Sequence, residues 1–385
     1  MTVHVPTTLI GPTTKGFWQP EPVTADAFTA AGHTLEDGSL TFPVLTLDAD
    51  ALAHNIAEMA GWTRDRGLDF APHGKTTMSP EIFAAQLAAG AWGMTVATGN
   101  QLLTAYELGV RRILVANEVV DPTVLRWIAG CDDAEILFYV DSVEGVALAA
   151  AAGGPVTVLL EVGYDRTGVR SREQAMAVTQ AIAATDTVSL RGVSAYEGGC
   201  ATLNEARAFL AEVRAFADEL RPFIDGEVVL SAGGSAYFDA VAAELRPFPG
   251  GRTILRSGSY VTHDHGTYVA STPFTRITGS LHPALRLWAQ VLSTPTDGLA
   301  LVGAGKRDVP YDAGLPVVLD KAGWTVTRTN DQHAFLEAGA EADPLHPGDV
   351  LELGISHPCT AFDKWRVIPV LDADRRVVDV VTTWF

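Results

Sequence analysis

The stretch LDFAPHGKTTMSPEIFAAQLAAGAWGMTVAT, residues 68 to 98, contains the pattern on which the fold prediction depends. It begins with a short apolar run that predicts a strand over residues 68–74. A helix is expected next, because Ser79 is a preferred N-cap residue, a proline follows it in the first turn, and Gly90 is a common helix stop. A second short run predicts another strand over residues 93–98. The stretch is therefore interpreted as one strand-helix-strand unit.

The same alternation continues along the chain. Six more apolar runs, separated by helix-like segments, occur at residues 112–117, 135–140, 157–163, 190–198, 227–233 and 252–258. Strands that are apolar throughout are typical of a parallel sheet covered on both faces, and eight such units favour closure into a (β/α)8 barrel. An open, doubly wound sheet is the alternative.

The pattern of expected strands and helices changes after the last of these strands. Short strands with turn residues between them and little helix predict a second, all-β domain. We expect the barrel domain to span residues 42–275, with one further strand in FPVLTLD ahead of the barrel. The N-terminal arm, residues 1–41, and the C-terminal β domain, residues 276–385, form the rest of the chain.

The composition disfavours several kinds of partner. Lys and Arg number 27 against 46 Asp and Glu, a formal net charge of −19, which disfavours nucleic acid and anionic lipid. Three cysteines far apart in sequence argue against a disulfide framework. The N-terminus lacks the pattern of a signal peptide, and the richest apolar stretch is broken at residues 153–155. We expect a cytoplasmic protein without a membrane span.

Lys75 directly follows the first strand of the predicted barrel. The C-terminal ends of the strands carry the active site in such barrels, so this lysine is expected among reactive groups. A phosphate-loop interpretation of GKT fails, because that motif needs glycine five residues before Gly74 and Asp69 stands there. Two uses remain. Lys75 can pair with a carboxylate, or it can form a Schiff base with a carbonyl cofactor.

Glycine loops follow the seventh and eighth strands. SAGGS contains Gly233, Gly234 and Ser235, and LRSGSY contains Gly258 and Ser259. Such loops let backbone N–H groups approach a phosphate, which barrels commonly bind at this place. Either loop alone can be only a tight turn. Together with the lysine after strand one, they favour a phosphorylated carbonyl cofactor, a description that pyridoxal phosphate fits.

Five motifs in this order resemble the alanine-racemase-type (fold type III) pyridoxal-phosphate enzymes: HGKTT, GYDRTG, AYEGG, SAGGS and LRSGSY. The resemblance is closest to the branch with D-serine dehydratase and D-threonine aldolase. It implies that Lys75 is the Schiff-base lysine. It also implies the remaining cofactor contacts, which are Arg166, Tyr196, Gly234, Ser235, Arg256, Gly258 and Ser259. The glycines and serines would bind phosphate, and Arg256 or a tyrosine would face the pyridine nitrogen. For Arg166, an ion pair with Asp165 or another carboxylate is the alternative.

His357 and Cys359 lie two residues apart in GISHPCTAFDKW, in the expected β domain. On an extended chain such residues share a face, so an imidazole and a thiolate can bind one ion, and this pair suits Zn²⁺. A buried cysteine beside a histidine with other partners is the alternative. The segment is similar to the metal-binding His-x-Cys of the D-serine dehydratase branch. That similarity implies a catalytic zinc site, with Mn²⁺ or another divalent metal as alternatives.

His263 and His265 in THDHG have the same spacing. They can form a competing metal pair or serve as acid/base groups of the active site. The D-serine dehydratase branch more often has aromatic and acidic residues here. The motif therefore departs from the branch and leaves the substrate side chain unassigned.

The resemblance implies a lyase that uses pyridoxal 5'-phosphate and zinc and acts on D-configured β-hydroxy amino acids. The first expectation is a D-serine dehydratase that releases a 2-oxo acid and ammonia. Lys75 would take the Cα proton, and zinc on His357 and Cys359 would help the β-hydroxyl to leave. The alternatives are D-threonine aldolase activity, which gives glycine and an aldehyde, and a pyridoxal-phosphate-binding protein without turnover. The family also implies a homodimer.

Overall fold

The computed structural model describes residues 2–385. The chain forms two compact units, and each is described by itself. The barrel unit comprises Met59–Lys75 and Phe83–Gly258, with residues 2–4. The β unit comprises Val5–Glu58, Thr76–Ile82 and Ser259–Phe385.

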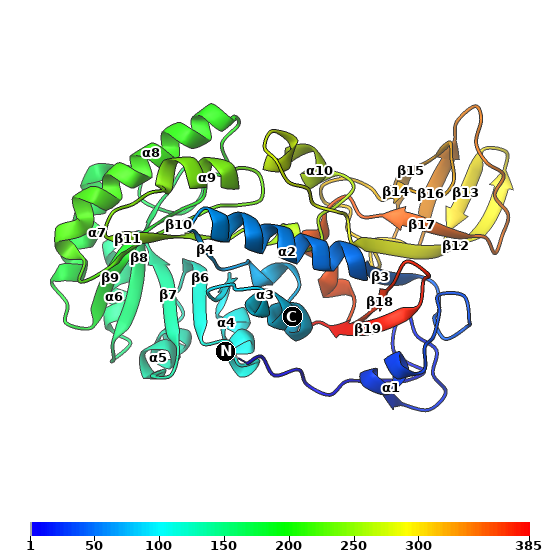
Figure 1. Ribbon diagram of the computed structural model, residues 1–385, viewed down its shortest axis with the longest axis horizontal. Coiled ribbons are helices and arrows are strands. Elements are labelled where there is room, and N and C mark those ends of the chain that lie inside the picture. The colour runs from blue at the N-terminus through cyan, green and yellow to red at the C-terminus, as the bar shows by residue number, and fades with distance from the viewer. Residues whose placement is uncertain (1) are drawn as a thin grey trace. The chain divides into compact units, whose positions relative to one another are not determined.

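Eight parallel strands form the barrel unit, in the order β4-β11-β10-β9-β8-β7-β6-β5 (Figure 1). They are β4 (Asp69–Phe70), β5 (Met94–Val96), β6 (Arg112–Glu118), β7 (Glu135–Val140), β8 (Val156–Val162), β9 (Val188–Ala195), β10 (Val228–Ala232) and β11 (Gly251–Leu255). A parallel bridge joins His73 to Thr95, and the Thr95 N–H donates to the carbonyl of Pro72 at 2.9 Å. Because this bridge links the two ends of the strand order, the sheet closes on itself. The predicted (β/α)8 barrel is confirmed.

Helices connect these strands: α3 (Pro80–Ala88), α4 (Gly99–Glu107), α5 (Pro122–Gly130), α6 (Val143–Ala150), α7 (Arg172–Ala183), α8 (Leu203–Leu220) and α9 (Phe238–Leu245). The helix expected within residues 68–98 is α3. The Ile82 N–H donates to Ser79 Oγ at 3.5 Å, and Gly90, two residues past the helix end, has a φ of 105°. Side chains also cap five other helices at Thr98, Asp121, Ser142, Ser171 and Thr202. Local sequence therefore sets most helix starts.

Buried side chains fill the interior of the barrel. Its core contains Ala71, Trp92, Leu114, Leu137, Tyr139, Leu159, Val229 and Ile254. Most of them lie on the strands β6, β7, β8, β10 and β11, as the packed interior of a closed barrel requires. The candidate site lies at the C-terminal ends of the strands, next to this core.

The β unit is built on a nine-stranded sheet, which confirms the predicted all-β domain. One path runs β15-β16-β13-β12-β3-β18-β19, and β17 pairs with both β12 and β14. The strands are β3 (Val44–Asp48), β12 (Leu285–Thr296), β13 (Leu299–Val302), β14 (Val317–Val318), β15 (Trp324–Thr329), β16 (Ala334–Ala338), β17 (Val350–Gly354), β18 (Val367–Leu371) and β19 (Val377–Thr382). The shorter elements are β1 (Leu9–Ile10), β2 (Val23–Thr24), α1 (Ala25–Ala30) and α10 (Thr267–Ser271). A core around Phe17, Phe28, Val44, Trp288 and Leu371 holds the unit together.

The boundaries of the two units differ from the predicted division at residues 42 and 275. Strand β3 was expected ahead of the barrel, but it pairs with β12 and β18 in the β unit. Residues 259–275 also belong to the β unit. An apolar strand pattern predicts the strand itself, but it does not indicate which sheet the strand joins. The helix after β3, α2 (Ala49–Asp65), carries the chain from one unit to the other.

No helix among residues 2–385 combines the length and the apolar character that a membrane-spanning segment requires.

Candidate active site and metal centre

Lys75 lies in the 3₁₀ turn η1 (Gly74–Thr76), directly after the bridge that closes the barrel. A Cβ on Gly74 would lie 2.6 Å from the ring of Phe83 and 3.3 Å from the carbonyl oxygen of Thr95, so a larger residue would displace the ring. The lysine side chain is exposed at the C-terminal end of the strands. This is the end at which barrel enzymes carry their active sites.

The charges of three side chains act on one histidine at this end of the barrel. Burial, and then the charges of Lys75, Arg256 and Arg166, lower the pKa of His73 well below its usual value. The three cations follow β4, β11 and β8 respectively, so they are far apart in sequence but share one end of the barrel. We call Lys75, Arg166 and Arg256 the cation cluster. It favours an anionic ligand and keeps His73 neutral at pH 7.

Arg256 is buried, and two hydrogen bonds fix the position of its guanidinium. It donates to Ser231 Oγ at 2.7 Å and to the carbonyl oxygen of Ala195 at 2.8 Å. Within the part of the chain that the structure describes, no carboxylate forms an ion pair with it. A buried charge without a counter-charge is costly. The position of Arg256 therefore suits an anionic group such as a phosphorylated cofactor.

Tyr196 packs beneath Arg166, whose guanidinium lies 4.0 Å from the centre of the ring. The ring also lies against two glycines: a Cβ on Gly198 would be 2.3 Å from it, and one on Gly234 would be 2.9 Å from it. These glycines therefore leave room for the ring. The alternative ion pair between Arg166 and Asp165 does not occur among the described residues.

The buried carboxylate of Glu197 holds the glycine loop after β10. It accepts hydrogen bonds from the N–H groups of Gly233 at 3.0 Å and Gly234 at 2.8 Å. The sequence predicted that Gly234 binds phosphate, but its N–H is engaged by Glu197 in this structure. The prediction missed Glu197, although it stands beside Tyr196 in AYEGG. A charged residue at the end of an otherwise apolar strand is the signal that could have found it.

A hydrogen bond ties the two glycine loops together. Ser257 Oγ donates to the carbonyl oxygen of Gly234 at 2.7 Å. Ser235 and Gly258, two of the predicted phosphate contacts, directly follow the two bonded residues in sequence, so the bond brings them near each other. Ser259 is buried, begins the 3₁₀ turn η3 (Ser259–Val261) and belongs to the β unit.

Two carboxyl groups face each other within the barrel, at the ends of β6 and β8. Burial, and then the neighbouring carboxyl of Glu161, raise the pKa of Glu118 to about 8. Glu161 Oε2 and His73 Nδ1 are buried without a hydrogen-bond partner among the described residues. Buried polar atoms are normally satisfied, so these atoms indicate a place for a ligand or ordered water. The sequence prediction missed both glutamates, although Glu161 interrupts the apolar run TVLLEV.

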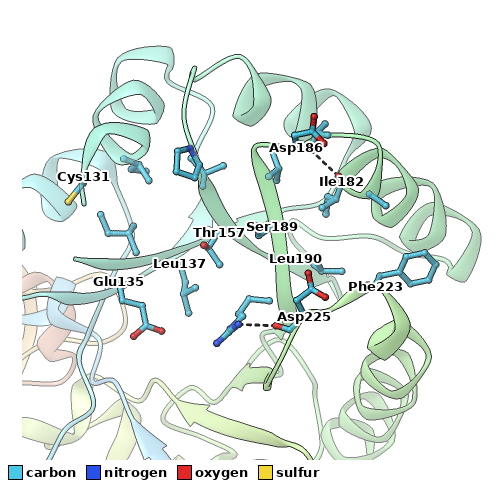
Figure 2. Close-up of a pocket in the computed structure, with 18 of the residues that line it drawn as sticks. Cys131, Glu135, Leu137, Thr157, Ile182, Asp186, Ser189, Leu190, Phe223 and Asp225 are labelled. Atoms are coloured by element: carbon cyan, nitrogen blue, oxygen red, sulfur yellow. Dashed lines mark hydrogen bonds between the residues drawn. The ribbon is translucent and has the colours of Figure 1, made fainter. Parts of the chain in front are cut away.

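A separate hollow lies at the opposite, N-terminal ends of the strands (Figure 2). It has a volume of about 680 Å³ and is lined by the first residues of β7, β8 and β9, among them Glu135, Thr157 and Ser189. Arg191 donates across it to the carbonyl oxygen of Asp225 at 3.0 Å. This end of a barrel usually contributes to stability rather than to catalysis. The cation cluster is therefore the better candidate for an active site.

The predicted metal ligands of the β unit lie in a tight turn. His357 has an extended backbone, but Cys359 lies in the 3₁₀ turn η5 (Pro358–Thr360). The expected alternation along an extended chain is thus wrong, yet the turn still brings the side chains together. Hydrogen bonding to Cys359 raises the pKa of His357 to about 9, despite burial and with further help from Asp312. We call His357 and Cys359 the metal pair.

Two further side chains contact the metal pair. Nδ1 of His357 lies 2.7 Å from Oδ2 of Asp312, and the hydroxyl of Tyr268 lies 3.8 Å from Sγ of Cys359. An imidazole and a thiol are the nitrogen and sulfur donors that Zn²⁺ prefers. Within residues 2–385 no group of three or more His, Cys, Asp or Glu side chains is arranged to hold a metal. The donor set therefore fits an ion that keeps coordination positions open, and not a closed structural site.

His263 and His265 do not join the metal pair in a cluster of that size. Burial lowers the pKa of both imidazoles to about 4, and neither Nδ1 has a partner among the described residues. A Cβ on Gly354 would lie 2.7 Å from the ring of His265, so that ring packs directly on the backbone of β17. The THDHG motif therefore contributes two neutral rings, of which His263 is buried and His265 half-buried.

Known protein families match most of the sequence. Residues 47–264 match the alanine racemase N-terminal domain, and residues 284–371 match a putative serine dehydratase domain. The first match alone covers more than half of the chain. The first match covers the barrel strands, and the second covers part of the C-terminal region of the β unit.

Curated relatives span most of the chain. A D-threonine aldolase from Arthrobacter sp is 30% identical over 339 residues, which are 83% of this chain and 86% of that protein. A 3-hydroxy-D-aspartate aldolase from Paracoccus denitrificans is 26% identical over 323 residues, which are 79% of this chain and 82% of that protein.

Solved structures extend the similarity to the fold. A D-threonine aldolase from Filomicrobium marinum matches with a TM-score of 0.78 and 26% identity, over 89% of this chain and 95% of that one. A histidine-to-alanine variant of D-threo-3-hydroxyaspartate dehydratase matches with a TM-score of 0.76 and 25% identity, over 93% and 98%. Together with the five motifs, these matches confirm the resemblance, and the chain belongs to the alanine racemase N-terminal domain family, in the branch with a serine dehydratase domain.

Proposed function

We propose that the protein is a pyridoxal-phosphate- and metal-dependent lyase that acts on D-configured β-hydroxy amino acids. The observation that carries the proposal is the cation cluster, in which Arg256 is buried without a carboxylate partner among the described residues. The similarity to two aldolases and a dehydratase with D-configured substrates in their names supports the same reaction class.

The barrel residues fit the cofactor in three ways. Lys75 offers a primary amine for a Schiff base, and Arg256 offers a fixed positive charge. Ser235, Gly258 and Ser259 are the remaining candidates for the phosphate, since the N–H of Gly234 donates to Glu197. When bound, pyridoxal phosphate supplies an electron sink for the negative charge that develops at Cα of an amino acid.

Lys75 is the proposed base in proton transfer. In a dehydration, the amine of Lys75 can take the Cα proton of the substrate, and this proton and the β-hydroxyl together make up the water that is lost. His73 is already neutral and does not compete for the cofactor's negative charge.

The metal pair would hold a divalent ion, for which Zn²⁺ is the first choice. Thiolate and imidazole ligands suit zinc, whereas Mn²⁺ prefers oxygen ligands. A zinc ion with open positions acts as a Lewis acid toward a hydroxyl oxygen. That chemistry assists either expulsion or deprotonation of a hydroxyl group.

Dehydration is our first candidate for the reaction, and D-serine is its first candidate substrate. Removal of the Cα proton and loss of the β-hydroxyl as water give an enamine, which hydrolyses to a 2-oxo acid and ammonia. A cysteine ligand, as against a second oxygen ligand, favours this outcome. The second candidate is aldol cleavage to glycine and an aldehyde, which the names of the two aldolase relatives favour.

Product analysis tests the proposal. Holoenzyme is incubated with D-serine, D-threonine and D-3-hydroxyaspartate, with their L-enantiomers as controls, before and after chelation. We expect turnover of D-substrates alone, lost on chelation and restored by Zn²⁺. A 2-oxo acid with ammonia identifies a dehydratase, and glycine with an aldehyde identifies an aldolase. If neither pair of products forms, the chain is instead the cofactor-binding protein without turnover. The homodimer and the cytoplasmic location stay predictions, and light scattering tests the first.

A further inference from the structure

Asp312 makes the shortest polar contact to the metal pair. Its Oδ2 lies 2.7 Å from Nδ1 of His357, although the two residues are 45 positions apart in sequence. Asp312 lies between β13 and β14 within the β unit. Because Nδ1 is engaged by the carboxylate, Nε2 is the ring nitrogen that is left for a metal ion.

The carboxylate of Asp312 is itself fixed in place. Its second oxygen, Oδ1, accepts a hydrogen bond from Thr360 Oγ1 at 3.2 Å, and Thr360 directly follows Cys359 in the turn η5. Both oxygens of the carboxylate are therefore directed at the turn that carries the metal pair.

A metal-binding imidazole needs a free lone pair on one nitrogen and its proton on the other. A carboxylate that accepts the Nδ1 proton selects this tautomer and fixes the plane of the ring. We propose that Asp312 is the positioning residue that directs Nε2 of His357 to the metal. This inference rests on the proposed function, because it presumes that the metal pair binds an ion.

The surroundings of Cys359 support the same interpretation. Tyr268, whose hydroxyl lies 3.8 Å from Sγ, belongs to α10. Asp264 anchors the start of that helix, since its carboxylate accepts from the Tyr268 N–H at 2.9 Å. Each member of the metal pair thus has one partner that restrains it. Such restraint is what distinguishes a metal site from a chance pair of donors.

An ordinary surface ion pair is the competing interpretation of Asp312, because its side chain is 46% exposed. Surface pairs of this kind contribute little to stability. The β unit contains a matched control. His346 and Asp349 form a second imidazole-carboxylate contact, with Nδ1 3.8 Å from Oδ2, whose histidine is far more exposed than His357. Only His357 has a thiol as well as a carboxylate beside it, so the two interpretations predict different effects on metal binding.

Zinc affinity of the holoenzyme, measured by competition with a chromophoric chelator, tests the inference. We expect Asp312→Ala to raise the Kd for Zn²⁺ about 10-fold to 100-fold, the range found when such partners are lost. Asp312→Asn should have a smaller effect, since an amide oxygen still accepts the Nδ1 proton. Asp349→Asn should leave the Kd unchanged. The absorption spectrum of the Co²⁺-substituted protein should shift for the Asp312 variants alone.

The outcomes separate this inference from the proposed function. If His357→Ala binds zinc as tightly as the wild type, the metal part of the proposed function is wrong, and the role of Asp312 with it. If His357→Ala loses the metal but both Asp312 variants keep the wild-type Kd and Co²⁺ spectrum, only the role of Asp312 is overturned. Unfolding midpoints of the metal-free proteins serve as the folding control. If Asp312→Ala does not fold, Asp312→Asn decides the question.

Discussion

The cation cluster of the barrel and the metal pair of the β unit differ in the charge that their surroundings provide. Around Arg256 the described residues offer a hydroxyl and a carbonyl oxygen but no carboxylate. Around His357 they offer a carboxylate and a thiol. The first site therefore suits an anion and the second suits a cation. Each unit, taken by itself, presents the electrostatic complement of one of the two proposed ligands.

The two sites also differ in how the chain builds them. The cation cluster gathers residues that follow three separate strands, β4, β8 and β11, so it depends on assembly of the parallel sheet. The metal pair comes from one short turn, and a single loop residue, Asp312, joins it from elsewhere. A site formed by strand ends can thus be predicted from the strand order. A partner on a distant loop cannot.

The largest expected effect tests the role of Lys75 in the cation cluster. Lys75→Ala should lower kcat by about 10²-fold to 10⁴-fold, the range for loss of a positioned proton-transfer group. It should also abolish covalent attachment of pyridoxal phosphate, measured by borohydride reduction and peptide mass spectrometry. Lys306→Ala, at an exposed lysine of the β unit, is the control. Reduced cofactor on any other lysine would contradict the assignment.

The next effect compares two arginines on or beside β11. Arg256 has no carboxylate partner among the described residues, whereas Arg252 pairs with Asp69, Glu135 and Glu227. Arg256→Met should weaken cofactor binding at least about 10-fold, because a hydrogen bond to a charged group contributes about 1.5–3 kcal/mol. Arg252→Met should reduce the free energy of unfolding but leave the cofactor Kd unchanged. Equal losses of cofactor affinity in the two variants would contradict a specific role of Arg256 in cofactor binding.

A smaller effect is expected at the glycine loop. Glu197→Gln replaces one of two acceptor oxygens by an N–H₂ group, which leaves the N–H of Gly233 or Gly234 without an acceptor. The free energy of unfolding should fall by about 1–3 kcal/mol, as for a buried group left unsatisfied. Urea unfolding measures it, with Glu212→Gln on the exposed face of α8 as the control. Equal stability of the two variants would show that the loop does not depend on Glu197.

The last effect concerns the pH dependence of stability that the carboxyl pair inside the barrel causes. Folded Glu118 keeps its proton up to a pKa of about 8, whereas a glutamate of the unfolded chain loses it near 4.5. The folded state therefore binds more protons between these pH values, and its stability should fall as the pH rises through them. In Glu118→Gln this part of the pH dependence should disappear. Urea unfolding of the cofactor-free protein from pH 5 to 8 measures the difference. Parallel curves would refute the raised pKa.

Much of the barrel unit could be predicted from the sequence. Its eight strands are continuous apolar runs, and its helices begin at recognisable capping residues. Because the strand order fixes where strand ends meet, the neighbourhood of Lys75 and Arg256 followed from the pattern. The engagement of Gly234 by Glu197 did not, because it depends on how closely two loops approach.

Less of the β unit could be predicted. The pattern of β3 gives a strand but not its sheet, since pairing depends on residues more than 200 positions away. The spacing of His357 and Cys359 indicated the metal pair, but the local structure is a turn and not a strand. Nothing in the sequence marks Asp312, because its contact with His357 forms only when two loops of the folded unit meet.

One measurement tests the central claim most directly: the pyridoxal phosphate and zinc content of the purified wild type, Lys75→Ala and His357→Ala, each reconstituted with both ligands. The account predicts about one of each per wild-type chain. It also predicts loss of covalently bound cofactor alone in Lys75→Ala and loss of zinc alone in His357→Ala. A wild type that retains no cofactor or no zinc, or a zinc content that is independent of His357, would contradict it.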